Sequence, residues 1–190
     1  LMPYLLKRYN YLCFRIFNEQ LEIQYDDMPN CFKNIFTLDE NGNIHMEQTK
    51  DIIDVIKKYQ GEVVFHRAFD CVKDPFESME KLISMGVDRV LTSGLKAKAM
   101  EGMEMIAKLQ KSYGEKIEIL AGSGINASNV LEIMDKTGIH QIHSSCKGWI
   151  KDPTTTGEEV SYSYAEGIHK DDYDVVDEKL VRELMERVKE

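Results

Sequence analysis

Short apolar runs alternate with amphipathic segments along most of this chain, and the rhythm is clearest from Gly61 onward. Strand-like runs lie at 62–66, 87–91, 116–121 and 139–143. Apolar side chains recur at helical spacing between and around these runs, which predicts helices over 46–59, 75–85, 97–113, 127–136 and 177–189. Strands that alternate with helices of this length form βαβ units, so the sequence predicts an α/β fold with a parallel sheet.

Local signals mark the turns and the helix ends. Asp74 stands at the N-cap of the helix over 75–85, and Pro75 and Glu77 follow it in a capping-box arrangement. Asn41-Gly42 is a common hairpin signal, but its flanks do not alternate between apolar and polar residues. We therefore interpret it as a βα loop.

The two faces of the predicted strands differ in character. One parity is apolar, as at Val63, Val90 and Ile119, whereas the other carries polar residues such as Arg89 and Glu118. Strands of an open, doubly wound sheet are apolar on both faces, so the mixed parity favours the inside of a parallel (βα)8 TIM barrel. A complete barrel takes about 250 residues, and only about four βα units fit here. We predict an incomplete barrel, about its C-terminal half, over residues 36–190, preceded by an atypical segment over 1–35.

Charge and cysteine content narrow the classes of partner. The chain has 24 Lys and Arg residues against 33 Asp and Glu, a net charge of −9. An acidic chain with scattered basic residues argues against nucleic acid or an anionic membrane as partner. The four cysteines are widely spaced and form no Cys-x-x-Cys pair, which favours a reducing cytoplasm over a disulfide framework. No apolar run approaches the roughly 20 residues that span a bilayer.

Polar residues follow each predicted strand, at the end where barrel enzymes carry out their chemistry. The sharpest stretch is Ala121-Gly-Ser-Gly-Ile-Asn126, whose glycines let backbone N–H groups approach an anion before the next helix. A tight turn that binds no ligand is the alternative. The anion-binding candidates are Thr92, Ser93, Gly122, Ser123, Gly124, Asn126 and Ser144.

Titratable residues on the same strands are the candidates for catalysis: His66, Asp70, Arg89, Glu118 and His143. His66 is a candidate acid or base because imidazole titrates near neutral pH, although a hydrogen-bonded structural histidine fits as well. Arg89 and Glu118 are expected mid-strand on neighbouring strands. They form either a pair that orients a substrate or a buried ion pair that fixes the register.

His143 and Cys146 are the candidate metal ligands, since a thiolate with an imidazole suits Cu(I) or Zn. Such spacing also arises by chance, so a site without metal is the alternative. The long polar segment 144–174 is hypothesised to fold over the barrel mouth as a lid.

Four ordered motifs resemble the CutC family of copper homeostasis proteins. They are Val64-Phe-His-Arg-Ala-Phe-Asp70, Asp88-Arg-Val-Leu-Thr-Ser-Gly94, Lys116-Ile-Glu-Ile-Leu-Ala-Gly-Ser-Gly-Ile-Asn126 and His140-Gln-Ile-His143. The resemblance runs from about Thr37 to the C-terminus, and it implies a (βα)8 barrel, a cytoplasmic role in copper homeostasis and copper as a ligand. Ser123 departs from the family pattern, in which a third glycine is usual. Leu1–Ile35 lacks the family's opening motifs and resembles a truncated or frame-shifted start.

Three functions stay open at this point. The chain is a CutC-like protein that binds copper or supports its homeostasis, a barrel enzyme acting on a small anionic or phosphorylated metabolite, or an inactive fragment. A half-barrel exposes strand edges and apolar faces, so we expect a homo-oligomer. The expected ligand is a small molecule or a metal ion.

Overall fold

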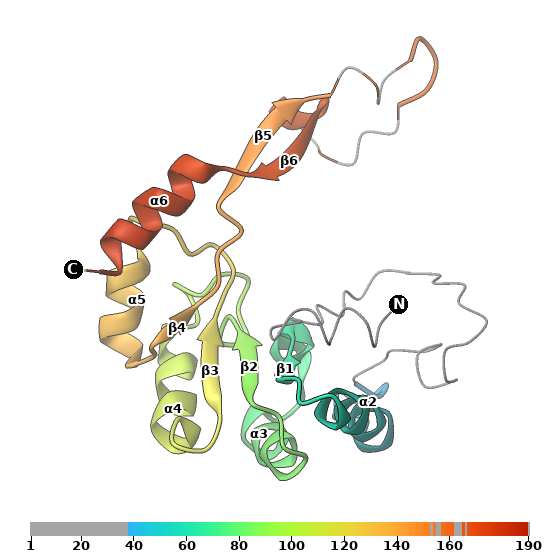
Figure 1. Cartoon of the computed structure of the whole chain (residues 1–190), viewed down its shortest axis with the longest axis vertical. Coiled ribbons are helices and arrows are strands. Elements are labelled where there is room, and N and C mark those ends of the chain that lie inside the picture. Colours follow the sequence, from blue (N-terminus) through green and yellow to red (C-terminus); the bar gives the residue numbers. More distant parts are fainter. Residues whose placement is uncertain (1–37, 153, 155–156, 162–164, 166, 190) are drawn as a thin grey trace. The chain divides into compact units, whose positions relative to one another are not determined.

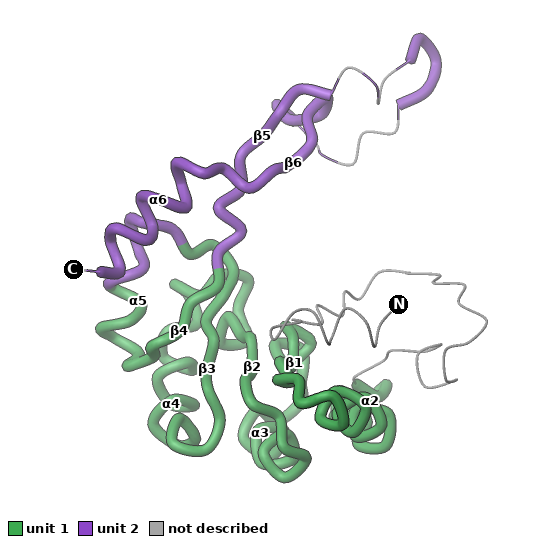
Figure 2. The backbone as a smooth tube through the Cα atoms, viewed as in Figure 1, with its two compact units in different colours: residues 1–125, 132–143 green, residues 126–131, 144–190 purple. Residues whose placement is uncertain are grey.

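The computed structural model describes residues 38–190 except 153, 155–156, 162–164, 166 and 190, so the predicted segment 1–35 lies outside the described residues. Figure 2 shows two compact units. The first ends at Ile125 and also includes Glu132–His143, and the second consists of Asn126–Leu131 and Ser144–Glu190. Within the described part of the chain, no helix is both long and apolar enough to cross a membrane.

A four-stranded parallel sheet forms the centre of the first unit (Figure 1). Its strands lie side by side in the order β1 (Val64–Phe65), β2 (Arg89–Thr92), β3 (Glu118–Ala121) and β4 (Gln141–Ile142). Helix α2 (Met46–Lys58) precedes β1, and consecutive strands are connected through α3 (Pro75–Ser84), α4 (Met103–Tyr113) and α5 (Val130–Thr137). Parallel neighbours in sequence order with a helix in each connection are the arrangement of a βα barrel. The prediction of an α/β fold of the TIM-barrel type is confirmed.

The apolar parity of these strands is buried, as the alternation predicts. Val90 and Ala121 have no exposed surface, and Phe65 is 5% exposed. Burying a side chain the size of Val90 or Phe65 stabilises the fold by about 1.5–3 kcal/mol, so this face fixes which way each strand is turned. The opposite parity is mixed, since Leu91 is buried and Glu118 is exposed.

Helix α3 begins where its sequence signals predict. The carboxylate of Asp74 accepts hydrogen bonds from the backbone N–H groups of Phe76 at 2.9 Å and Glu77 at 3.1 Å. Pro75 occupies the first turn, where a missing N–H costs nothing. The Glu77 carboxylate pairs with Lys81 at 2.7 Å. The N-cap prediction is therefore confirmed.

The loop between β2 and α4 is longer than the sequence pattern suggested. Helix α4 begins at Met103 rather than at Ala97, so the predicted start is wrong. The physical reason is a close backbone contact, because a Cβ atom on Gly102 would lie 1.9 Å from the carbonyl oxygen of Ser93. Residues 94–102 thus fold back on the end of β2 before the helix can start.

The segment around Asn41-Gly42 is a tight turn that leads directly into α2, whose N-cap is His45. Leu38 and Ile44 form an antiparallel bridge. Asp39 closes the turn, since its N–H donates to the Asn43 carbonyl at 2.8 Å and its carboxylate accepts from the Asn43 N–H at 2.8 Å. One isolated bridge forms no pair of hairpin strands, which agrees with the interpretation of this segment as a loop before a helix.

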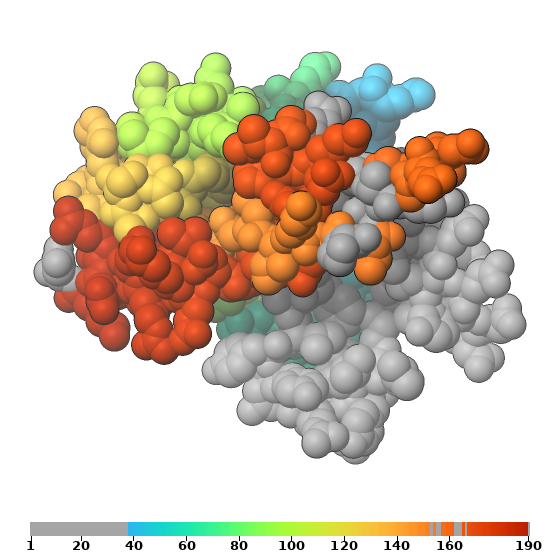
Figure 3. Space-filling model, turned by 90° about the horizontal axis from the view of Figure 1, so that it is seen from above, coloured from blue at the N-terminus to red at the C-terminus, as the bar shows by residue number. Residues whose placement is uncertain are grey.

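The second unit contains an antiparallel ribbon followed by a helix. Strands β5 (Lys147–Lys151) and β6 (Asp172–Val176) pair along their whole length, with η3 (Gly167–His169) between them, and α6 (Glu178–Arg187) follows. The ribbon and α6 form the orange and red surface in Figure 3. The Trp149 and His169 rings stack with centroids 4.3 Å apart, and His169 Nδ1 lies 2.7 Å from Asp172 Oδ2. Part of the predicted lid segment is therefore regular structure, while its role as a lid stays a prediction.

Candidate functional site at the carboxyl edge of the sheet

The carboxyl ends of the four parallel strands bring several predicted residues to one edge of the first unit. The registers of β2, β3 and β4 align their last residues, so Ser93, Gly122 and His143 stand in one row just beyond the sheet. Gly122 N donates to Thr92 O at 2.9 Å, and His143 N donates to Ala121 O at 2.7 Å. This edge is where barrel enzymes bind their substrates.

Asp70 organises the part of the edge that follows β1 and β2. It lies in the short helix η2 (Arg67–Cys71), and its side chain is 7% exposed. One carboxylate oxygen accepts from Thr92 Oγ1 at 2.6 Å and from the Ser93 N–H at 2.9 Å, and the other accepts from Arg67 Nε at 2.7 Å. The Leu95 N–H adds a bond at 3.2 Å. Asp70 therefore clamps two loops together.

Thr92 and Ser93 are brought to the edge as predicted, but their side chains face inward. Both residues are fully buried, and the Ser93 hydroxyl lies 2.9 Å from the Asp70 carboxylate. Their hydroxyl groups are therefore taken up by the clamp, and we do not assign them to ligand contact.

Arg67 is a cation held in a fixed position at this edge. Besides its bond to Asp70, its Nη2 donates to Ser93 Oγ at 2.6 Å and to the Lys96 carbonyl at 3.3 Å. Its side chain remains 40% exposed. A guanidinium that is oriented on one side and open on the other suits an anionic ligand.

His66 directly precedes η2 and caps it. Its Nδ1 accepts a hydrogen bond from the Ala68 N–H at 3.0 Å, so the neutral ring carries its proton on Nε2. Burial lowers the pKa of His66 below its ordinary value of 6.5, because the charged ring loses solvation. A neutral imidazole with Nδ1 occupied is a hydrogen-bond donor through Nε2, and this geometry favours a donor over a general base.

The Gly122-Ser123-Gly124 loop has a left-handed backbone, with φ +80° at Ser123 and +76° at Gly124. Glycine adopts this conformation freely and serine does not, which gives a physical reason for the usual glycine at position 123. Ser123 Oγ donates to the Ala97 carbonyl at 2.8 Å, and the Ala99 N–H donates to the Ser123 carbonyl at 3.0 Å. The loop after β2 is thus joined to the glycine loop after β3.

Lys98 is the residue that this junction adds to the site. A Cβ atom on Gly124 would lie 2.8 Å from Cδ of Lys98, so the lysine stem lies against this glycine. Lys98 is exposed, as is Lys96 two residues earlier. Lys98 is absent from the predicted site residues because the sequence pattern assigns the range 97–113 to a helix. The available signal was the run Leu-Lys-Ala-Lys directly after Gly94.

Arg89 and Glu118 lie at the opposite end of the sheet, where each is the first residue of its strand. The expectation that they lie mid-strand is wrong. Arg89 hydrogen-bonds Glu118 and lies 2.8 Å from Glu62, and Gln141 also contacts the Glu118 carboxylate. The bond to Glu118 raises the pKa of Arg89. This cluster ties three strands together and is remote from the carboxyl edge, so its location favours a role in strand register.

The remaining predicted residues belong to the second unit. The side-chain Oδ1 of Asn126 accepts from the Ser128 N–H at 2.9 Å, and this turn is why α5 begins at Val130 rather than at 127. Ser144 Oγ accepts from the Cys146 N–H at 3.2 Å and lies 3.5 Å from its Sγ. Among the described residues, no group of three or more His, Cys, Asp or Glu side chains is arranged to hold a metal ion.

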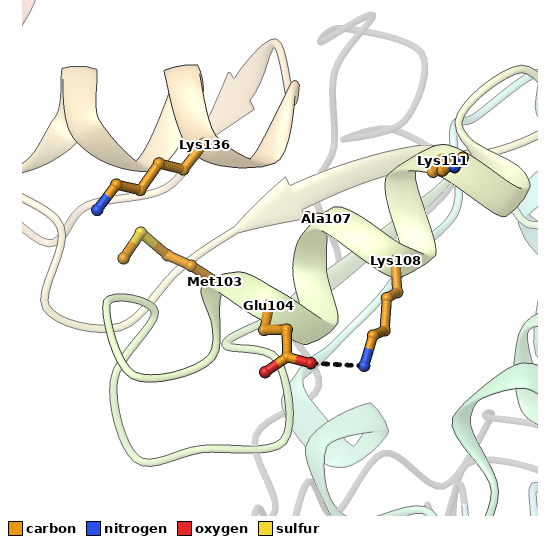
Figure 4. A pocket seen from close by; sticks show the side chains of 6 residues that line it. All are labelled: Met103, Glu104, Ala107, Lys108, Lys111 and Lys136. Carbon is orange, nitrogen blue, oxygen red and sulfur yellow. Dashed lines mark hydrogen bonds and ion pairs between the residues drawn. The ribbon is translucent and has the colours of Figure 1, made fainter.

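A groove of about 480 Å³ lies on α4 (Figure 4). It is lined by Met103, Ala107, Lys111 and Lys136 together with an ion pair, 2.7 Å long, between Glu104 and Lys108. None of the predicted site residues is among these lining residues. The carboxyl edge, which combines cations, a glycine loop and a half-buried histidine, is the better candidate site.

Comparisons with known proteins agree with the motifs. The profile of the CutC family matches residues 23–148, so the match begins within the segment 1–35. A family protein CutC of Glaesserella parasuis serovar 5 is 43% identical over 112 residues, which cover 58% of this chain and 45% of the relative. One of Vibrio cholerae serotype O1 is 41% identical over 110 residues, with coverage of 58% and 43%.

A solved structure also shows similarity to the CutC family. A copper homeostasis protein CutC from Streptococcus agalactiae has a TM-score of 0.52 and 29% identity, covering 56% of this chain and 51% of that protein. The chain thus spans about half the length of the relatives it matches. Since the family profile covers more than half of the sequence, the chain belongs to the CutC family.

Proposed function

We propose that the carboxyl edge of the sheet binds a small anionic metabolite through a phosphate or carboxylate group. The observation that carries this proposal is Lys98, whose stem lies against Gly124 of the left-handed glycine loop. Arg67 supplies a second, oriented cation, and the Lys96 carbonyl fixes the loop beside it at 3.3 Å. The net charge of −9 repels anions from the chain as a whole. The cations at this edge attract an anion locally in spite of that repulsion.

His66 supplies an uncharged donor to the same site. Through a bound water molecule, its Nε2–H can polarise a carbonyl or stabilise a developing negative charge. The proposed chemistry is therefore electrostatic stabilisation of an anion in a barrel mouth. Whether turnover follows is measured by comparing His66→Gln with the parent protein on any ligand that binds.

A thermal-shift titration with inorganic phosphate, then with sugar phosphates, tests the proposal. Binding at a ligand concentration about 100 times the Kd adds roughly 2.7 kcal/mol to the stability of the parent protein. Lys98→Met should lose most of this gain, because it keeps the stem against Gly124 but removes the charge. Lys111→Met, on the exposed face of α4, is the matched control and should keep it. An equal gain in both variants would refute the assignment.

Copper homeostasis is the second candidate function, favoured by family membership and by the name of the Streptococcus agalactiae relative. We propose that Cu(I) is bound through Cys146, which is half-buried. An anaerobic competition assay with a Cu(I) chelator should show uptake that Cys146→Ser abolishes. Cys71→Ser, which changes an exposed thiol, is the control and should leave uptake intact.

A cytoplasmic location and a homo-oligomeric state are part of the same proposal. The sheet ends at β1 and β4 in the part of the chain that the structure describes, and the open edges of these two strands favour pairing with a second copy. Light scattering on the purified chain should give a mass of at least two chains, and a well-folded monomer would refute the oligomer.

A further inference from the structure

Thr49 is a buried threonine in α2 whose hydroxyl group lacks the hydrogen bond that a helical threonine usually makes. It lies on the buried face of α2, beside Ile52 and Ile53, and is 4% exposed. A helical threonine commonly donates to a carbonyl three or four residues earlier. Thr137 does so, since its Oγ1 donates to the Ile133 carbonyl at 2.6 Å. Thr49 Oγ1, in contrast, has no hydrogen-bond partner among the described residues.

The same threonine lines a small cavity with His66. The cavity has a volume of about 30 Å³, and it lies between α2 and β1 with Glu62 as the other ionisable residue on its wall. A single water molecule needs at least about 10–15 Å³ of such volume and two to four polar partners. The cavity is large enough for one water and too small for a metabolite.

A water molecule in this cavity would give the imidazole of His66 a hydrogen-bond acceptor. Its Nδ1 is occupied by the Ala68 N–H, so Nε2–H is the polar ring atom left to be paired. Of the two groups on this cavity wall, the Thr49 hydroxyl is fully buried and costly when unpaired, whereas His66 is half-buried, and one water molecule pairs with both.

We propose that Thr49 is a positioning residue that holds a buried water molecule against His66. The water accepts from Nε2–H of His66 and donates to Oγ1 of Thr49. It fixes the imidazole in the tautomer described above and stabilises its protonated form over the neutral one. This inference rests on the proposed role of His66 at the carboxyl edge, and it identifies the residue behind the histidine that sets its donor strength.

The test is an NMR titration of the His66 ring in the full chain, with the signal assigned by its loss in His66→Gln. Thr49→Val keeps the shape of the side chain and removes the hydroxyl, so the water loses an anchor. The pKa of His66 should then fall further, by about 0.5 or more, because the charged ring loses a stronger hydrogen bond than the neutral ring does. Thr49→Ser keeps the hydroxyl and should titrate as the parent does. Thr137→Val, which changes a hydroxyl paired within its own helix, is the matched control and should also leave the titration unchanged.

Two results would overturn the proposal. One is a Thr49→Val variant with a higher melting temperature and an unchanged His66 titration, which would mean that the hydroxyl was merely buried and unpaired. The other is a high-resolution crystal structure with no water within hydrogen-bond distance of Thr49 Oγ1, and this measurement holds even if Thr49→Val does not fold. Neither readout uses a ligand, so failure of the proposed anion binding is detected separately by the phosphate titration.

Discussion

Asp70→Asn is the substitution that most directly tests the clamp at the carboxyl edge. The amide oxygen is best placed where it still accepts from Thr92 Oγ1 and from the N–H groups of Ser93 and Leu95. Each of these bonds then ends on a neutral acceptor instead of a charged one, a loss of about 1 kcal/mol per bond. The amide NH2 also faces Arg67 Nε–H, and because Arg67 is 40% exposed this conflict adds less than about 1 kcal/mol.

The expected loss of stability is therefore about 3 kcal/mol, which corresponds to a fall in melting temperature of roughly 6–12 °C for a chain of this size. Urea denaturation followed by far-UV circular dichroism measures it. Asp74→Asn is the control, since asparagine and aspartate cap helices equally well and the change should stay below about 0.5 kcal/mol. If Asp70→Asn costs less than about 1 kcal/mol, Asp70 does not clamp these loops and the positions of Arg67 and Lys98 lose their support.

Two further variants probe the loop and the histidine. Gly102→Ala should prevent folding or destabilise strongly, because its Cβ would lie 1.9 Å from the Ser93 carbonyl, whereas Gly157→Ala, with 3.7 Å to its nearest neighbour, should be near neutral in the same denaturation assay. The lowered pKa of His66 means that its contribution to stability is present above the unfolded value near 6.5 and is lost as the pH falls from there through the folded-state pKa. Stability measured against pH should therefore flatten below pH 6.5 in His66→Gln, whereas His140→Gln, at an exposed position, should keep the slope of the parent.

The features that were predicted correctly depend on local signals. The strands and the parallel order follow from the spacing of apolar runs, and α3 follows from Asp74 and Pro75, which act within one turn. His66 and Gly122 are predicted at the carboxyl edge because parallel strands bring their ends to the same edge, independently of the conformation of the loops. Elements of this kind can be derived from a single sequence.

The features that were missed depend on contacts between loops. Lys98 joins the site only because its stem contacts Gly124, twenty-six positions later in the chain. The start of α4 depends on the close contact between Gly102 and Ser93. The spacing of apolar residues along the sequence does not reveal such a contact. Arg89 and Glu118 were assigned to the middle of their strands because strand ends are uncertain by one or two residues. A shift of that size moved the pair to the opposite end of the sheet.

The stack of Trp149 on His169 has a practical consequence for any study of this chain. Trp149 is the only tryptophan, and it lies on β5 of the second unit. Its fluorescence therefore reports the local environment of the ribbon alone, whereas the helical signal comes from both units. A fluorescence midpoint that precedes the loss of helix would reveal a ribbon that melts as a separate cooperative element. Coincident midpoints would show that the two units share one unfolding transition.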